Sequence, residues 1–399
     1  MTAVEFKNVD IVFGDNQQEA IPMVDAGKTR EEILEKTGCV LGVAGGSIKI
    51  EEGEICVLMG LSGSGKSTLL RAVNGLNKVT RGEVLVRDGD NLVDVASCDE
   101  KTLRHMRMER VSMVFQQFAL LPWRTVSENV GLGLELKGMP KAEREAIVEE
   151  KLKMVSLDQW KDKYAHELSG GMQQRVGLAR AFATDADILL MDEPFSALDP
   201  LIRDHLQDEL LELQRNLKKT IVFVSHDLDE ALKIGSHIAI MEGGRIVQYG
   251  EPEEIVLNPA NEYVAEFVAH MNPLNVLRCA SLMTSVSDLR KDGDRLILDK
   301  YDAFKVTVDG KGAVQKVTFE EKEELPVITF EGDQPIDSVP DSSIVVTSPD
   351  FTMKRAIELR QATGNPVLLA ENGVLVGVVG DEEIYKGILR QSSIADAAE

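Results

Sequence analysis

A glycine-rich octet, GLSGSGKS at residues 60–67, matches every fixed position of the phosphate-loop pattern G-x-x-x-x-G-K-S/T. The apolar run ICVLM at 55–59 leads directly into it, and apolar residues at helical spacing follow it before Gly75. This order predicts a strand, a loop and a helix, the local structure in which backbone amides bind phosphate. The context therefore favours a nucleotide-phosphate site over a chance glycine turn.

The loop residues have distinct expected roles. Its glycines let the backbone curl so that successive N–H groups face the phosphates. Lys66 is placed to reach the β and γ phosphates, and Ser67 to ligate Mg²⁺. Thr68 either assists the α phosphate or only begins the helix. The residues expected to bind nucleotide here are Gly60, Ser62, Gly63, Ser64, Gly65, Lys66, Ser67 and Thr68.

Two later apolar runs, ILLM at 188–191 and IVFV at 221–224, predict strands buried on both faces. Strands alternating with helices predict an α/β fold with a mixed, largely parallel sheet, whose ligands bind at the carboxyl ends of its strands. Asp192 is predicted to hold Mg²⁺ through water, Glu193 to act as general base for the attacking water, and His226 to contact the γ phosphate and orient that water. A solvated turn and a capped loop histidine are the plainer alternatives.

A second glycine pair occurs in LSGGMQ, residues 168–173, directly before another helical pattern. The hydroxyl of Ser169 and the amides of Gly170 and Gly171 would therefore lie at a helix amino terminus, which attracts anions. Since one ATP already has its phosphate loop, this second anion site needs a separate explanation.

Composition limits the partners of the chain. The formal net charge of −23 is spread over all 399 residues and argues against nucleic acid, which requires clustered Lys and Arg. The four cysteines form no C-x-x-C pair and are expected to be reduced thiols. No apolar run approaches the roughly 18 residues of a spanning helix, and the amino terminus lacks signal-peptide features. Any role at a membrane is therefore expected to need other subunits.

In their order and spacing, GLSGSGKS, LSGGMQ and ILLMDEP resemble the motifs of ABC-type ATPases, and the likeness covers roughly residues 1–270. It implies a P-loop ABC ATPase domain at 1–275, with a helical subdomain at about 117–180. It also implies that the LSGGMQ site of one copy acts on the ATP of another, so that a homodimer holds two ATPs.

The resemblance assigns three further residues. Gln116 would sense Mg²⁺ and water, and Asp199 would lie in the loop that couples the two sites. Phe13, at the end of the first predicted strand, either stacks on adenine or packs in the core. A soluble ABC ATPase of repair or translation is an alternative, but it would be expected to show basic surfaces or paired ATPase domains in one chain, and neither appears in the sequence. A metabolite kinase is a further alternative, and the LSGGMQ motif argues against it.

The inserted segment at 17–40, in which Thr29 and Glu32 have capping-box spacing and Gly38 marks a helix end, narrows the likeness further. Together with DEPFSALDPLIR it resembles the ATP-binding subunit of bacterial importers for quaternary amines, the glycine betaine, proline and choline group; PWRTV leans toward choline. The resemblance implies multispanning permease subunits, an extracytoplasmic substrate-binding protein, and a peripheral place on the cytoplasmic face of the inner membrane. Trp123 would then lie near the permease contact, with a buried Trp as the alternative.

Residues 276–399 are expected to form a small α+β domain, a degenerate CBS-like unit that is clearest at 350–392. Its pattern is a helix, a strand, an Asn-Gly turn, a second strand and a second helix. Gly380 and Glu383 stand where such units commonly have Thr or Ser and Asp, which argues against adenosine binding. Ligand sensing and a purely structural role both remain open.

Overall fold

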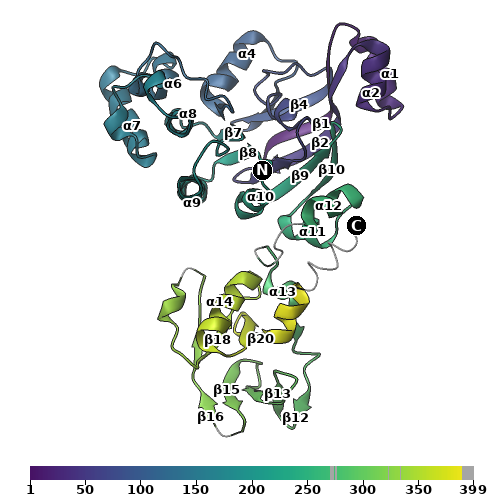
Figure 1. Cartoon of the computed structure of the whole chain (residues 1–399), viewed down its shortest axis with the longest axis vertical. Helices are drawn as coiled ribbons and strands as arrows, with labels where there is room; N and C mark the ends of the chain where they lie inside the picture. Colours follow the sequence, from purple (N-terminus) through teal and green to yellow (C-terminus); the bar gives the residue numbers. More distant parts are fainter. Residues whose placement is uncertain (270–273, 275, 322, 333, 389–399) are drawn as a thin grey trace. The chain divides into compact units, whose positions relative to one another are not determined.

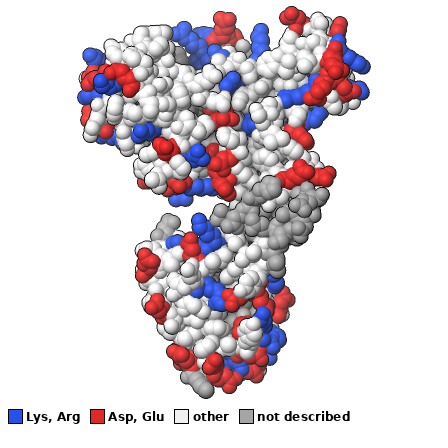
Figure 2. Space-filling view, in the orientation of Figure 1, with Lys and Arg blue, Asp and Glu red and all other residues white. Residues whose placement is uncertain are grey.

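The computed structural model describes residues 1–269, 274, 276–321, 323–332 and 334–388. The chain forms two compact units, Met1–Ile255 and Val256–Glu399 (Figure 1). The domain boundary predicted between residues 275 and 276 adjoins positions outside the described residues and stays a prediction. On the face drawn in Figure 2, acidic and basic side chains are interspersed in both units.

The first unit is built on a six-stranded sheet in the order β10-β9-β3-β8-β7-β6. Only β10 runs antiparallel to its neighbour, so the predicted largely parallel sheet is confirmed. Every residue of the three strands β3, β7 and β8 is buried, which is why they read as continuous apolar runs. The six strands are β3 (Ile55–Met59), β6 (Val111–Val114), β7 (Ile188–Asp192), β8 (Thr220–Val224), β9 (His237–Glu242) and β10 (Arg245–Gly250).

A second, antiparallel sheet packs against the first. Its order is β2-β1-β4-β5, and its strands are β1 (Thr2–Phe13), β2 (Val40–Glu51), β4 (Arg81–Asp88) and β5 (Asn91–Asp94). One apolar core joins the inward residues of both sheets with Leu69 and Leu70 of α3 (Lys66–Leu70). This helix is shorter than the pattern up to Gly75 predicts, because the amides of Ala72 and Val73 bond to carbonyls three residues back and tighten the chain into turns.

The inserted segment contains two helices, whereas the sequence predicts one. The predicted one is α2 (Arg30–Thr37), with both hydrogen bonds of the Thr29 and Glu32 capping box and a left-handed Gly38 at its end. The other is α1 (Gln17–Asp25), whose pattern is obscured by Pro22 inside it. The two helices bury a small core of their own against β1 and β2.

Most remaining helices of the first unit lie between β6 and β9 in the sequence. Figure 1 places α6, α7 and α8 on the opposite side of the unit from α1 and α2. The helices are α4 (Glu100–His105, continuing into a π turn at Met106–Arg110), α5 (Val126–Val130), α6 (Leu132–Leu136), α7 (Lys141–Met154), α8 (Gly170–Ala183), α9 (Pro200–Leu217), α10 (Leu228–Ile234) and α11 (Pro252–Leu257), which crosses into the second unit.

The second unit contains α12 (Glu262–Ala269), α13 (Cys279–Leu282) and two five-stranded sheets that share one apolar core. One sheet is the antiparallel meander of β12 (Lys291–Asp292), β13 (Arg295–Ile297), β14 (Phe304–Val308), β15 (Val314–Phe319) and β16 (Glu323–Leu325). The other has the order β11-β20-β19-β18-β17, formed by β11 (Thr284–Ser285), β17 (Val327–Thr329), β18 (Ile344–Thr347), β19 (Val367–Glu371) and β20 (Val374–Val379).

The predicted helix, strand, turn and strand after residue 350 are confirmed as α14 (Met353–Thr363), β19, a left-handed Asn372-Gly373 turn, and β20. The last predicted helix spans 381–388, and Leu389 lies outside the described residues. The CBS-like interpretation of this unit stays a prediction.

Candidate functional site

The phosphate loop connects β3 with α3 and is pinned against neighbouring backbone. Gly60 and Gly65 have φ values of +136° and +107°. A Cβ at Gly60 would lie 2.1 Å from the carbonyl oxygen of Met241, and one at Gly65 would lie 2.4 Å from that of Gly42. Only glycine fits at these two positions, so the predicted loop depends on backbone shape as well as on charge.

Lys66 begins α3 and folds its side chain back across the loop. Its ammonium donates hydrogen bonds to the carbonyl oxygens of Gly60 at 2.8 Å and Leu61 at 3.0 Å. Burial lowers the pKa of Lys66, and the nearby carboxylates of Glu193 and Asp192 partly oppose this shift. The loop thus encloses a positive charge beside its amides, as a triphosphate site requires.

Asp192 ends β7 and is fully buried. Its Oδ1 accepts a 2.7 Å hydrogen bond from the Ser67 hydroxyl, so the structure brings these two predicted metal ligands together. Its Oδ2 accepts from Arg71, at 2.8 Å from Nη2 and 3.2 Å from Nε. Sequence reasoning missed Arg71, although its position one helical turn after Ser67 places both on one side of α3.

Glu193, Gln116 and His226 follow three adjacent strands and meet at one carboxylate. Gln116 Nε2 donates to Glu193 Oε2 at 2.9 Å, and His226 Nδ1 lies 3.6 Å from the same oxygen. Glu193 has a left-handed φ of +50°, and its amide donates to the carbonyl of Val224 at 3.1 Å. The predicted base is therefore held in a costly conformation by contacts from both neighbouring strands.

Gln174 on α8 is a second residue that sequence reasoning missed. Its side chain is 1 % exposed. Nε2 donates to the carbonyl of Glu193 at 3.0 Å, and Oε1 accepts from the amide of Ala197 at 3.1 Å. The helix that begins in LSGGMQ is thereby fastened to the loop that carries the predicted base.

Ser169, Gly170 and Gly171 begin α8 as predicted. The Ser169 hydroxyl accepts from the amide of Met172 at 3.4 Å, and both Ser169 and Gly170 are exposed. Asp199 is also exposed, and although it stands at the amino end of α9 its side chain makes no capping hydrogen bond there. The helix tip and this carboxylate are therefore accessible to a second molecule.

Phe13 lies beside the phosphate-loop helix rather than in the core. Phe13 as a whole residue is 41 % exposed, and a Cβ on Gly42 would lie 2.9 Å both from Phe13 Cε2 and from Thr68 Cγ2. Arg30, from the inserted α2, reaches the same place, where it donates to the carbonyls of Gly63 and, at 2.8 Å, Gly42. No sequence motif marks Arg30, so this contact could not be expected from the sequence.

Trp123 is 70 % exposed, so it is not the buried Trp that formed the alternative. Its loop is held by Asn129, a buried amide that accepts from the amide of Leu121 at 2.8 Å. Asn129 Nδ2 donates to three carbonyls, those of Leu121, Arg124 and Thr125. A large apolar side chain is thus exposed on a loop that hydrogen bonds hold in place.

Among the described residues, none of the helices combines the length and apolar character that crossing a bilayer needs. The sequence model of the ABC transporter family matches residues 43–196. The chain is 49 % identical over 296 residues to the glycine betaine transport ATP-binding protein of Bacillus subtilis. The aligned region covers 74 % of this chain and 70 % of the relative. The chain is also 41 % identical over 387 residues to the glycine betaine/carnitine transport ATP-binding protein of Listeria monocytogenes, covering 95 % and 96 %.

A solved structure supports the same assignment. It is a dimeric ATP-binding cassette, MJ0796, bound to ADP and phosphate, which is 32 % identical with a TM-score of 0.54 and covers 62 % of this chain and 98 % of its own. The motifs, the sheet and these similarities agree on a nucleotide-hydrolysing subunit. The chain belongs to the family of ABC transporter ATP-binding proteins that includes the glycine betaine transport subunits.

Proposed function

We propose that this ATPase drives an importer for quaternary ammonium compounds such as glycine betaine, proline betaine or choline. The observation that best supports ATP hydrolysis is that the side chains of Gln116 and His226 both lie at the Glu193 carboxylate. The solute class is supported by the names of the relatives, which include a glycine betaine/proline betaine protein of Escherichia coli at 53 % identity over 264 residues and a choline protein of Bacillus subtilis at 43 % over 223.

In the reaction, Glu193 accepts a proton from the water that attacks the γ phosphate, and the bond from the γ phosphorus to the bridging oxygen breaks, so that ADP and phosphate are formed. Gln116 and His226 fix the orientation of its carboxylate, and the His226 imidazole contacts the γ phosphate. Lys66 leaves its carbonyl partners to bind the β and γ phosphates, while the loop amides hold their oxygens in place.

Mg²⁺ fits the donors that the chain provides. Ser67 and Asp192 present two oxygen atoms 2.7 Å apart, and such a small set suits an ion that takes its other ligands from water and phosphates. When bound, the ion would neutralise charge on the β and γ phosphates. Gln116 would contribute to its surroundings, and Arg71 would keep the Asp192 carboxylate oriented.

Two copies of the chain would close on two ATPs, with Ser169, Gly170 and Gly171 at the amino end of α8 in each copy facing the phosphates held by the other. Asp199 would lie between the two sites, and Phe13 would stack on adenine. The exposed Trp123 loop would contact a multispanning permease at the cytoplasmic face of the membrane. Closure in ATP and opening after hydrolysis would drive release of solute delivered by an extracytoplasmic binding protein.

The test is the variant Glu193→Gln in the complex with its permease. Loss of the base is expected to lower ATP turnover by about 100-fold or more, and the variant alone is expected to dimerise in ATP, as measured by light scattering. Glu143→Gln, on the exposed surface of α7, is the matched control. Unimpaired turnover in the Glu193 variant would refute the role of Glu193 as the base. The solute class would be refuted if vesicles that contain the unaltered complex took up no quaternary amine.

A further inference from the structure

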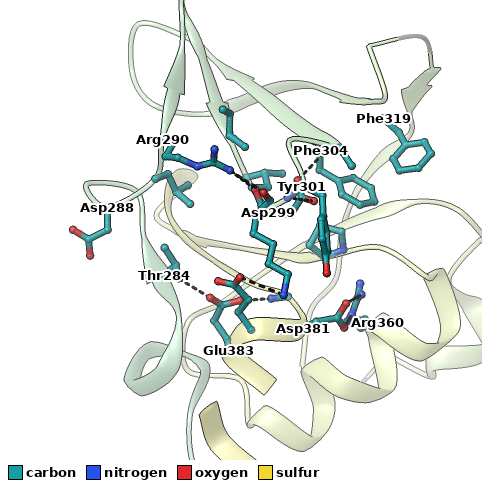
Figure 3. A pocket seen from close by; sticks show the side chains of 18 residues that line it. Thr284, Asp288, Arg290, Asp299, Tyr301, Phe304, Phe319, Arg360, Asp381 and Glu383 are labelled. Atoms are coloured by element: carbon teal, nitrogen blue, oxygen red, sulfur yellow. Dashed lines mark hydrogen bonds and ion pairs between the residues drawn. The ribbon is translucent and has the colours of Figure 1, made fainter. Parts of the chain in front are cut away.

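The second unit contains a cavity of about 500 Å³ that plays no part in the nucleotide site. It lies where the β12–β16 sheet meets the start of the helix at 381–388. The two sheets of this unit share one apolar core, so its walls are fixed relative to one another. In Figure 3, Asp299 and Tyr301 lie on one side of the cavity, and Asp381 and Glu383 lie on the opposite side.

The charges lining this cavity favour a cation. Five carboxylates outnumber three basic groups: Asp288, Asp299, Asp381, Glu382 and Glu383 against Arg290, Lys300 and Arg360. Phosphate-bearing ligands are disfavoured by this balance.

Each carboxylate already has a partner within the chain. Asp381 pairs with Arg360 at 2.6 and 2.7 Å, and Asp299 accepts from the amides of Tyr301 at 3.2 Å and Phe304 at 3.0 Å. Asp288 accepts from Ser285, Glu382 pairs with Lys300, and Glu383 accepts from Thr284 and Gly380. The cavity is therefore negative but offers few free acceptors, which suits a cation that has no N–H donors of its own.

An ammonium group of the chain itself shows where such a cation would bind. Lys300 Nζ lies 4.9 Å from the centre of the Tyr301 ring and 3.9 Å from Glu382 Oε1. The Tyr301 side chain is 77 % exposed, so its ring can be reached by a ligand. Phe304 and Phe319, whose ring centres are 4.9 Å apart, add an apolar wall.

We propose that this cavity binds a small quaternary ammonium solute, whose cationic head takes the place of the Lys300 ammonium on the face of the Tyr301 ring. The proposal rests on the proposed function in that it gives the second unit a ligand of the same chemical class as the transported solute. The ATPase subunit would thereby register the concentration of that solute in its own compartment.

Adenosine is a poorer fit to the same cavity. A carboxylate with free oxygens is a common partner of ribose hydroxyls, but Glu383 is 4 % exposed and both of its oxygens are engaged. Its Oε1 accepts from the Thr284 hydroxyl at 2.6 Å, and its Oε2 accepts from the Gly380 amide at 2.8 Å.

The experiment is calorimetric titration of the full chain, without permease, with tetramethylammonium and choline as probes. The neutral isostere 3,3-dimethyl-1-butanol separates attraction to a cation from apolar burial. Saturable binding with Kd on the order of 1 mM is expected for both cations, and much weaker binding for the isostere. Because no permease is present, a failure of vesicle uptake and a failure of this binding are independent results.

Variants locate the site. Tyr301→Ala is expected to weaken choline binding about fivefold, whereas Tyr301→Phe retains it because the ring face remains. Lys300→Met is expected to tighten binding about threefold by removing the competing ammonium, and Lys311→Met, an equal charge change on an exposed turn outside the cavity, is the control. Equal affinity for the isostere, unchanged binding in Tyr301→Ala with an unaltered unfolding midpoint, or binding of adenosine but not of tetramethylammonium would each overturn the proposal.

Discussion

Replacing Gln174 by Leu tests whether α8 holds the catalytic loop in place. The substitution keeps a buried side chain of similar size but removes the 3.0 Å bond to the Glu193 carbonyl and the 3.1 Å bond from the Ala197 amide. The Glu193 carbonyl retains the Ser196 hydroxyl at 3.0 Å, and Ala197 is exposed enough to bond water. Neither group is therefore left fully unsatisfied.

These contacts set the expected magnitude. Two hydrogen bonds at about 1 kcal/mol each give a loss of about 2 kcal/mol in the free energy of unfolding. For a unit of this size, that loss corresponds to a decrease of about 4–8 °C in the unfolding midpoint. Turnover should fall by about tenfold, because Glu193 loses one of the contacts that hold its left-handed backbone and its carboxylate shifts away from the attacking water. A tenfold loss corresponds to an increase of about 1.4 kcal/mol in the activation free energy. KM for ATP should stay near its original value, since Gln174 bonds to the Glu193 loop and not to the phosphate loop.

The assay is steady-state ATP hydrolysis together with thermal unfolding followed by tryptophan fluorescence. Gln173→Leu is the matched control, because Gln173 is the neighbouring residue on α8 and its side chain donates to the carbonyl of Leu168 instead. A Gln174 variant with unchanged kcat and midpoint would refute the reasoning. Equal losses in both variants would show that the effect belongs to α8 as a whole.

Two further predictions concern Arg30 and Lys305. Arg30→Met should raise KM for ATP several-fold, and Arg30→Lys by less, because only arginine can reach the carbonyls of Gly63 and Gly42 together; equal KM values in initial-rate measurements would contradict this role. In the second unit, hydrogen bonds from Lys305 lower the pKa of the Asp292 and Glu321 carboxyls. Lowered carboxyl pKa values stabilise the fold above the ordinary carboxyl range and lose that effect as the pH falls through the lowered values. The unfolding midpoint of Lys305→Met should therefore lie below that of the unaltered chain at pH 7, and the two should converge as the pH falls below the ordinary carboxyl range; a gap independent of pH would exclude this explanation.

The elements that the sequence predicts correctly are those whose signal is local. Gly60 and Gly65 are required by the backbone itself, and continuous apolar runs mark the strands that are buried on both faces. Because the carboxyl ends of parallel strands meet at one edge, residues that follow those strands could be expected to lie together. Glu193, Gln116 and His226 do so.

What the sequence does not predict depends on contacts between distant residues. Arg30 meets Gly63, and Gln174 meets the Glu193 loop, without any periodic pattern to mark either partner. Pro22 conceals α1 because a proline inside a helix removes a hydrogen bond. In the β12–β16 sheet, strands as short as two residues and a buried Lys305 give too little alternation to read.

The position of the base at the junction of three strands ties activity to the alignment of the sheet. Val114 pairs with Met191 and Asp192 pairs with Val224, so the side chains that follow β6, β7 and β8 coincide only in this register. A slip by one residue would turn a partner of the carboxylate toward the other side of the sheet. ATP turnover per molecule therefore also reports whether the strands are in the correct register. A preparation that refolds with all of its secondary structure but with misaligned strands would lack ATPase activity.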